Sequence, residues 1–148
     1  MGALSVYLDA NVLVAFFTVD VFSARAIAFL QSQTPALLTS DFTAAEFASA
    51  VGRRVRMGDL TCDQALLAFG NFDIWVSRVV TRIEATGADI RAAERMLRRL
   101  DLNLRTPDAI NIAIAQRVGA ELATFDTRMA DNARVLGLPL TPLRLSNP

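Results

Sequence analysis

Apolar and polar positions follow two different periods along the chain, and their alternation predicts alternating strands and helices. Short apolar runs at 5–8, 36–39, 79–83 and 121–125 have the length and composition of buried β-strands. Between these runs, apolar residues recur at the three- and four-residue intervals of amphipathic helices. Because strands and helices alternate, we expect an α/β fold, a three-layer α/β/α sandwich with a mostly parallel central sheet.

Capping residues and helix breakers predict where the helices begin and end. Small polar side chains at an N-cap accept hydrogen bonds from first-turn N–H groups, which otherwise lack partners. Pro35, Gly58 and Gly137 are expected to end helices. The helix that starts after Thr61 is expected to reach Trp75. The expected N-caps are Asp20, Ser40 or Asp41, Thr61, Thr106 and Asp126.

Two segments in the second half of the chain carry more specific expectations. A helix is predicted from 88 to 100, with a stripe of arginines on its solvated face. The segment Leu138–Leu143 is expected to form an edge strand, because Pro139 and Pro142 cannot donate to a central ladder. In the helix predicted from 88 to 100, the residues expected to face inward are Ile90, Ala93, Leu97 and Leu100.

The composition fits one folded domain, expected to span residues 1–148. An apolar content of 53% in 148 residues argues against disorder and allows a proper core. The formal net charge is zero, so no overall field attracts nucleic acid, although local basic patches remain open. With no charged leader and no membrane-length apolar run, we expect a soluble, cytoplasmic protein without membrane association.

Missing residue types narrow the chemistry that the chain can perform. There is no His, and all 15 basic residues are Arg, so the usual general base and the lysine of a P-loop are absent. Cys62 is the single cysteine, which excludes an internal disulfide and a Cys-rich zinc site. Carboxylate, amide, hydroxyl and guanidinium groups remain.

Four acidic residues from distant parts of the chain are expected to meet at one edge of the sheet. Asp9 and Asp126 each follow a predicted strand, and the carboxyl ends of parallel strands lie on the same edge. Asp108 opens a predicted helix, and a helix between parallel strands starts at that edge too. Glu46 lies early in the helix after the second strand, so it can reach the same rim.

Each acid also has an ordinary explanation. Asp9 and Asp126 could be plain N-caps, and Asp108 a plain first-turn acid. Glu46 could belong to a solvated helix face. Like charges that converge at a sheet edge repel one another, however, and a bound cation makes the whole arrangement reasonable. Oxygen ligands without His or Cys favour Mg²⁺, with Mn²⁺ as a substitute, and such sites usually serve phosphate chemistry.

An amide is expected beside these acids. Asn111 lies three residues after Asp108, on the same face of a helix that is apolar almost all round. Such a helix is buried, and a carboxylate and an amide at its end need partners because unpaired burial of polar groups costs free energy.

The stretches around the four acids follow one another in a recognisable order. They are Tyr-Leu-Asp9-Ala-Asn-Val-Leu, Thr-Ala-Ala-Glu46-Phe, Leu-Arg-Thr-Pro-Asp108-Ala and Ala-Thr-Phe-Asp126. With these stretches the chain resembles the PIN-domain nucleases, and most of all the VapC toxins of bacterial toxin–antitoxin pairs. The resemblance runs from about Val6 to Pro142, and it implies a PIN-like fold with the four acids as its site.

The resemblance implies an Mg²⁺-dependent endoribonuclease whose products carry 5′-phosphate and 3′-hydroxyl ends. Asp9, Asp108 and Asp126 would hold the metal, directly or through water. Glu46 would complete the metal's shell or orient the attacking water. Because no His is available, the metal would have to lower the pKa of the water, with a carboxylate taking the proton.

Three polar residues are expected to support the acids. By resemblance, Asn11 fits the polar position that follows the first acid, and Thr124 fits a Thr-x-Asp pattern that ends at Asp126. Asn111 stands where relatives often carry other residues, including His, so the family assigns it no fixed role.

Arginines near the acids are candidates for contacts with RNA phosphates. Arg105, three residues before Asp108, is the first of them, although it could equally be a loop arginine paired with an acid. A second group follows Glu46 and could extend a binding track. Its members are Arg53, Arg54 and Arg56.

The resemblance also implies protein partners. VapC-like proteins pair with a VapB-type antitoxin and are typically homodimers, so both partners are expected here. A dimer could join two monomers into one continuous RNA groove. Most aromatic side chains of the first two helices should be core, and some could line an antitoxin groove. These residues are Phe16, Phe17, Phe22 and Phe29.

Other classes of protein remain open on the sequence alone. A receiver-like phosphoacceptor domain also places Mg²⁺ and carboxylates at strand ends, but it relies on a Lys, which is missing here. Haloacid-dehalogenase-like phosphatases want a Lys and an Asp-x-Asp pair, whereas this chain has Asp9-Ala10-Asn11. The non-enzymatic alternative is a catalytically degenerate PIN fold that only binds RNA or protein.

Overall fold

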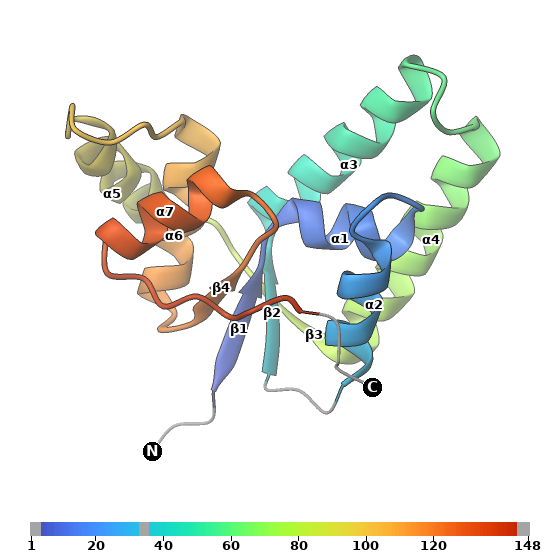
Figure 1. Ribbon diagram of the computed structural model, residues 1–148, viewed down its shortest axis with the longest axis horizontal. Helices are drawn as coiled ribbons and strands as arrows, with labels where there is room; N and C mark the ends of the chain where they lie inside the picture. Colours follow the sequence, from blue (N-terminus) through green and yellow to red (C-terminus); the bar gives the residue numbers. More distant parts are fainter. Residues whose placement is uncertain (1–3, 33–35, 145–148) are drawn as a thin grey trace.

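A parallel sheet stands at the centre of the computed structural model, which describes residues 4–32 and 36–144 (Figure 1). Its strands are β1 (Ser5–Leu8), β2 (Ala36–Ser40), β3 (Val80–Ile83) and β4 (Glu121–Ala123), in the spatial order β3-β2-β1-β4. All the pairings between these strands are parallel. The helices are α1 (Ala10–Phe17), α2 (Ser23–Gln31), α3 (Asp41–Arg56), α4 (Cys62–Val79), α5 (Gly87–Leu97), α6 (Thr106–Arg117) and α7 (Thr127–Val135).

Two separate cores, one on each face of the sheet, confirm the expected three layers. Successive strand residues point to opposite faces, so Val6 and Leu8 pack on one side while Tyr7 packs on the other. Helices α1 to α4 cover the Val6 face, and α5 to α7 cover the Tyr7 face (Figure 1). Among the described residues, no helix is both long and apolar enough to cross a membrane.

Several helix boundaries follow the sequence prediction. Ser40 caps α3 by accepting a hydrogen bond from the Thr43 N–H, and Thr61 forms a full capping box with Gln64 at the start of α4. Glycines at 58 and 137 follow helices with positive φ, as the expected stops require. Helix α4 continues past Trp75 to Val79, since no breaker stands between them. Pro35 lies outside the described residues.

Two predicted N-caps are wrong. Asp20 lies before α2, where its Oδ1 accepts a hydrogen bond from the Phe22 N–H and orders the turn, and Phe22 itself occupies the N-cap position. Thr106 is the first helical residue of α6, and the N-cap is Arg105, which makes no capping bond. Pro107 is tolerated inside the first turn because its missing N–H would have had no helical partner.

The helix predicted from 88 to 100 is α5, in which Ala93 and Leu97 pack against the core as expected, whereas Ile90 and Leu100 do not. It ends at Leu97, so Leu100 is 96% exposed, and Ile90 is 50% exposed. The inward position beside Ala93 is taken by Asp89, which is buried and pairs with Arg117 of α6 at 2.7 Å. An ion pair between a buried carboxylate and an exposed guanidinium therefore replaces the apolar contact that the pattern suggested.

The end of the chain is simpler than predicted. Strand β4 stops at Ala123 rather than at 125. The segment 138–143 makes one isolated bridge, between Leu122 and Leu140, instead of an edge strand. The Leu122 N–H donates to the Pro139 carbonyl and the Thr141 N–H to the Leu122 carbonyl, and the prolines on either side leave no N–H to extend the ladder.

The aromatic cluster under α1 should dominate the stability of the domain. Phe47 is 1% exposed, and its ring lies 4.7 Å from Phe72 and 5.8 Å from Phe17, centroid to centroid. We expect Phe47→Ala to lower the free energy of unfolding by about 3–5 kcal/mol, measured by urea denaturation. Leu66→Ala, at a side chain that is 66% exposed, should cost less than about 0.5 kcal/mol. Equal losses would contradict this assignment of the core.

Candidate active site

The carboxyl edge of the sheet gathers four acids, here called the acidic edge, from four different elements. Asp9 follows β1 and caps α1, while Asp126 follows β4 and caps α7. Asp108 lies in the first turn of α6 and Glu46 in the second turn of α3. Their charges act on one another: Asp108 and Asp126 raise the pKa of Asp9, and Asp9 and Asp108 raise the pKa of Glu46. The four acids thus share one electrostatic environment.

Asp9 is buried at this edge and has several hydrogen-bond donors. Its Oδ1 accepts a hydrogen bond from the Ala10 N–H at 2.8 Å, and its Oδ2 accepts one from the Thr124 hydroxyl at 2.7 Å. The Asn11 side-chain amide adds a third donor to Oδ2 at 3.1 Å. Burial outweighs these donors and raises the pKa of Asp9 to about 6.

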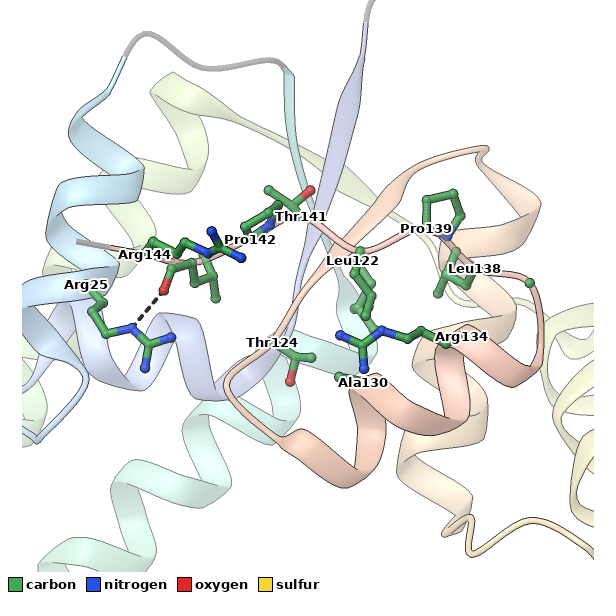
Figure 2. Close-up of a pocket in the computed structure, with 13 residues that line it drawn as sticks. Arg25, Leu122, Thr124, Ala130, Arg134, Leu138, Pro139, Thr141, Pro142 and Arg144 are labelled. Carbon is green, nitrogen blue, oxygen red and sulfur yellow. Dashed lines mark hydrogen bonds between the residues drawn. The ribbon is translucent and has the colours of Figure 1, made fainter. Parts of the chain in front are cut away.

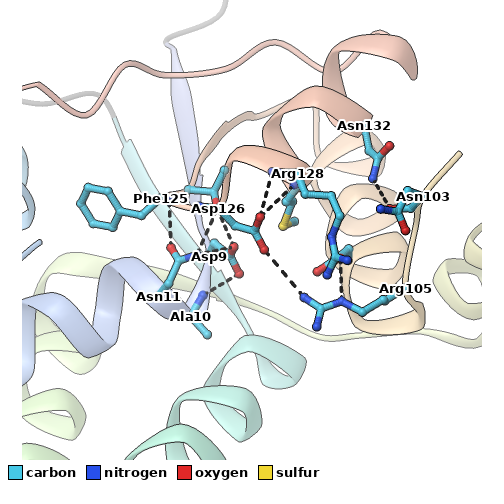
Figure 3. Close-up of polar contacts among 12 residues, drawn as sticks. Asp9, Ala10, Asn11, Asn103, Arg105, Phe125, Asp126, Arg128 and Asn132 are labelled. Carbon is cyan, nitrogen blue, oxygen red and sulfur yellow. Dashed lines mark hydrogen bonds and ion pairs between the residues drawn. The ribbon is translucent and has the colours of Figure 1, made fainter.

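Asn11 and Thr124 join the two segments that carry Asp9 and Asp126, and Figure 3 shows Asn11 between Asp9 and Phe125. The Asn11 amide donates to the Thr124 hydroxyl at 3.2 Å and accepts a hydrogen bond from the Phe125 N–H. Thr124 in turn accepts from the Asp126 N–H at 3.0 Å. Both supporting residues therefore contact the acidic edge and fix the spacing between its two strands.

Asn111, whose role the sequence left open, holds Glu46. Its Nδ2 donates to the Glu46 Oε1 at 2.6 Å, so an amide from α6 orients a carboxylate from α3. Burial raises the pKa of Glu46 to about 7, with the charges of Asp9 and Asp108 adding to the effect and the Asn111 hydrogen bond opposing it. Near neutral pH, Glu46 can therefore exist in either protonation state.

A buried group of hydroxyls, which we call the hydroxyl network, fixes the orientation of the Asn111 amide. It consists of Tyr7, Ser40 and Thr43 around Asn111. The Tyr7 hydroxyl donates to the Asn111 Oδ1 at 2.7 Å, and the Thr43 hydroxyl donates to the same oxygen at 3.0 Å. With Oδ1 receiving two donors, Nδ2 is the end of the amide that faces Glu46.

Sequence reasoning missed the part that Tyr7 and Thr43 play. Tyr7 looked like one apolar residue of a buried strand, and Ser40 looked like a helix cap, which it also is. A tyrosine inside a fully buried strand still needs a partner for its hydroxyl, and that need is the signal the sequence offered. The partner itself, 104 positions away, could not be read from a local pattern.

Asp108 lacks a full set of partners. Its side chain is 9% exposed, and its Oδ2 has no hydrogen-bond partner among the described residues. The Arg105 Nε lies 3.5 Å from this oxygen, too far for a good hydrogen bond, so Arg105 acts on Asp108 as a nearby charge. Burial raises the pKa of Asp108, the charge of Arg105 opposes the rise, and the charge of Asp126 adds to it.

Arg105 stands between two acids of the edge (Figure 3). Its Nη2 lies 3.7 Å from the Asp126 Oδ2, while the other oxygen of Asp126 accepts two backbone N–H groups at the start of α7. The loop before Arg105 is anchored, because the Asn132 amide donates to the Asn103 carbonyl at 2.7 Å. The sequence expected Arg105 to contact phosphate or pair with an acid, and the structure shows the pairing.

The residues of the acidic edge fit a hard divalent cation by chemistry, although their side chains do not form a closed cage. Within 4–32 and 36–144, no three His, Cys, Asp or Glu side chains converge closely enough to hold one metal ion. The donors are all oxygen, the type that Mg²⁺ and Mn²⁺ prefer. The Asp108 Oδ2 has no hydrogen-bond partner among the described residues, and burial raises the pKa of Asp9 and of Glu46, so a bound cation would stabilise the charged form of these acids.

A groove and a cavity flank the acidic edge on different sides. The groove, of about 620 Å³, lies between Glu46 on α3 and Pro107 on α6, and we call it the α3 groove. The cavity, of about 660 Å³, lies behind Thr124 under the C-terminal segment (Figure 2). In that cavity the Arg25 Nε already donates to the Leu143 carbonyl at 2.7 Å. One of the four acids, Glu46, lines the groove, whereas the cavity is lined by Thr124, which donates a hydrogen bond to Asp9.

The structure is thus that of an α/β protein whose parallel sheet carries four acids at its carboxyl edge, in a chain with neither His nor Lys. Comparison with known proteins identifies its family. The family model of the PIN domain matches residues 6–135. The chain therefore belongs to the PIN domain family, as its sequence motifs suggested.

Its relatives include VapC-type proteins. The chain is 38% identical over 64 residues to Ribonuclease VapC46 from Mycobacterium tuberculosis, a match that spans 41% of this chain and 49% of that protein. Its fold is similar to that of VapC20 from M. tuberculosis, a toxin that cleaves the sarcin–ricin loop, with a TM-score of 0.70 at 21% identity over 85% of this chain and 93% of the other. FitAcB from Neisseria gonorrhoeae has a TM-score of 0.68 at 16% identity, over 93% and 96% of the two chains.

Stability of the metal-free protein should depend on pH through the acidic edge. The pKa of Asp9 is about 6 against an ordinary 3.8, and that of Glu46 about 7 against 4.5, so the folded state binds more protons than the unfolded state between these values. The free energy of unfolding should therefore fall as pH rises from about 4 to about 7. Thermal unfolding in EDTA across this range measures it.

Asp9→Asn is the control for this pH dependence, because it removes one titrating group and keeps a similar shape. The variant should flatten the lower part of the slope. Because the charge of Asp9 raises the pKa of Glu46, the remaining part should move to somewhat lower pH. The pKa of Asp89 is lowered by its partner Arg117, so its contribution is lost at more acidic pH and does not mask the effect. A stability that rises through the window would contradict the prediction.

The hydroxyl network should contribute to stability as a unit. Tyr7→Phe removes one of the two donors to the Asn111 Oδ1 and should lower the free energy of unfolding by about 1–2 kcal/mol. Thr43→Val removes the other donor. Since the two hydroxyls share one acceptor, the double variant should deviate from additivity by at least about 0.5 kcal/mol in urea denaturation. Strict additivity would show that the two hydroxyls act independently.

Proposed function

We propose that this protein is a metal-dependent endoribonuclease, the toxin of a VapBC-type toxin–antitoxin pair. The observation that carries the proposal is the acidic edge: buried carboxylates from distant elements share one site, and the Asp108 Oδ2 has no hydrogen-bond partner among the described residues. Membership of the PIN domain family and the partial match to a protein named as a ribonuclease support it. Burying several carboxylates together costs free energy, and a cation bound between them would offset that cost.

In this proposal Asp9, Asp108 and Asp126 hold Mg²⁺, which Mn²⁺ can replace. The bound ion supplies an activated water and neutralises charge that develops on the phosphate oxygens. Asp126 keeps one oxygen on the N-terminus of α7 and has the other free of backbone contacts, next to Arg105. Thr124 and Asn11 hold the Asp9 carboxylate at a fixed orientation through their donors.

Glu46 is the group best placed to accept a proton. Asn111 donates to its Oε1, so the other oxygen, Oε2, remains available. A pKa of about 7 suits a general base that must take up and release a proton near neutrality. Attack by water at phosphorus then breaks the bond to the 3′-oxygen, which takes up a proton as it leaves, so the products carry a 5′-phosphate and a 3′-hydroxyl. Arg105, already beside Asp108 and Asp126, would exchange those acids for a substrate phosphate.

A binding-only PIN fold is the second candidate, and one observation favours it. Arg105 supplies positive charge between Asp108 and Asp126 in the structure, and no three acids of the described residues form a ready metal cage. Such a protein would bind RNA or a protein partner without cutting. The intact contacts around Asp9 and Glu46 favour the nuclease instead, because a fold that only binds needs no oriented carboxylates.

We also propose a VapB-type antitoxin and a second copy of the chain as partners. Several structures with a similar fold are toxin–antitoxin complexes, including VapBC2 from Rickettsia felis, with a TM-score of 0.67 at 16% identity over 93% of this chain and 98% of that one. Phe16, Phe17 and Phe22 are partly buried against the core, so their exposed edges remain available to an antitoxin helix. The apolar side chains Val19 and Val21, 84% and 87% exposed, lie between α1 and α2 and could extend that surface.

Loss of one site carboxylate should abolish cleavage. Asp108→Asn removes a charge from the acidic edge with little change of shape, and we expect RNA cleavage with Mg²⁺ or Mn²⁺ to fall by at least about 100-fold. The measurement uses antitoxin-free protein and a mixed pool of structured RNA, with EDTA as the metal-free reference. Asp131→Asn is the matched control, because Asp131 is 74% exposed on α7 and contacts only Arg134 among the described residues.

The two variants separate the possible outcomes. Equal cleavage by Asp108→Asn and Asp131→Asn would indicate a contaminant or a different site. If neither variant nor the wild type cleaves, calorimetry with Mg²⁺ and Mn²⁺ decides between a selective nuclease and a binding-only fold. If Asp108→Asn binds Mg²⁺ and Mn²⁺ as tightly as the wild type, the proposed metal site is wrong.

A further inference from the structure

The α3 groove opens directly from the acidic edge and carries its own positive charge. Glu46 stands at its inner end, opposite Pro107 of α6, and Arg53 and Met57 follow along α3. Positions 46, 53 and 57 are spaced by seven and by four, so they share one face of the helix. Arg53 lies about 10 Å from Glu46 along the helix axis, at 1.5 Å per residue. Helix α3 leads away from the sheet edge, so the groove does too (Figure 1).

The structure separates three arginines that the sequence could not tell apart. Arg54 is committed: its Nη1 donates to the Thr18 hydroxyl at 2.6 Å and its Nη2 to the Val19 carbonyl at 3.0 Å, which ties α3 to the end of α1. Arg56 folds back along its own helix, where its Nη1 lies 3.4 Å from the place a Cβ on Gly52 would take. Arg53 is exposed, lines the groove and has no ion pair among the described residues.

An available guanidinium beside a cluster of acids points to an anionic ligand. The acidic edge alone repels a polyanion, so a nucleic acid that reaches it needs positive charge on its path. Arg53 supplies that charge in the groove that Glu46 enters, and the small side chains of Ser49 and Ala50 between them leave room for a chain to pass. Much of the remaining lining is apolar, so Arg53 is the group in this groove that attracts an anion, and it does so by its charge.

We infer that the α3 groove binds single-stranded RNA next to the cleavage site, with Arg53 contacting a phosphate of that strand. This inference rests on the proposed nuclease function and adds the path that the substrate takes. A guanidinium binds a phosphate through paired N–H groups, so the contact is charge-assisted and independent of base sequence. Arg53 therefore contributes to substrate binding, while Glu46 and the other acids contribute to the reaction.

The test measures binding of a fluorescently labelled single-stranded RNA of mixed sequence by anisotropy, in EDTA so that no cleavage interferes. We expect Arg53→Gln to weaken the affinity by about tenfold and to lower the slope of log K against log salt by about 0.7, the share of one phosphate contact on a single strand. Arg53→Lys should keep most of the slope because it keeps the charge. Arg56→Gln is the matched control, with the same change of charge elsewhere on α3, and should behave as wild type.

Cleavage assays on the same variants separate this inference from the proposed function. Arg53→Gln should raise KM and leave kcat within about twofold, since the residue acts on binding. If the wild type binds RNA through Arg53 but never cleaves it, the groove stands and the nuclease proposal fails. If the wild type cleaves and Arg53→Gln binds like Arg56→Gln, the groove assignment is wrong. No measurable RNA binding by the wild type, or a changed oligomeric state in Arg53→Gln alone, would also overturn it.

Discussion

Repulsion among buried carboxylates is the constraint that the rest of this site depends on. Burial alone disfavours the charged form of each acid, and the neighbouring acids add to that cost, which is why the pKa of Asp9 and that of Glu46 rise well above ordinary values. The fold opposes this cost with donors rather than with lysines or histidines, which the chain lacks. A hydroxyl, two side-chain amides and helix N-termini supply partial positive charge, and Arg105 supplies a full one.

Each of these donors also holds two elements together. Asn11 and Thr124 join the end of β1 to the end of β4, and Asn111 joins α6 to α3. The contacts that orient the acids are thus the contacts that set the distance between the two layers of helices at the sheet edge. The same hydrogen bonds therefore stabilise the domain and orient the acids. The carboxylates keep their orientation although their negative charge is only partly neutralised.

The sequence predicted those parts of the molecule that local chemistry decides. Strand order aside, the apolar runs located the strands, and Asp9 and Asp126 were recognisable as residues at strand ends. It failed where a partner far along the chain decides the outcome. Asp89 faces inward on α5 because it pairs with Arg117 of α6. The apolar periodicity alone does not reveal this partner, and it therefore predicted that Ile90 would face inward. The pairing of Asn111 with Glu46 and the hydroxyl that Tyr7 directs at Asn111 depend in the same way on tertiary contacts.

Charge placement would let a chain with zero net charge bind a polyanion, as the proposed function requires. Six of its arginines are engaged in ion pairs within the described residues: Arg82, Arg98, Arg99, Arg105, Arg117 and Arg134. Those pairs cancel charge at the surface and leave the local field to arginines without an acid partner. Arg53 is such a residue and lines the groove that Glu46 enters, so the strongest uncancelled attraction for a phosphate in that groove lies beside the acids. A uniformly basic surface would bind RNA anywhere, whereas an arginine without an acid partner in this groove would favour binding near Glu46.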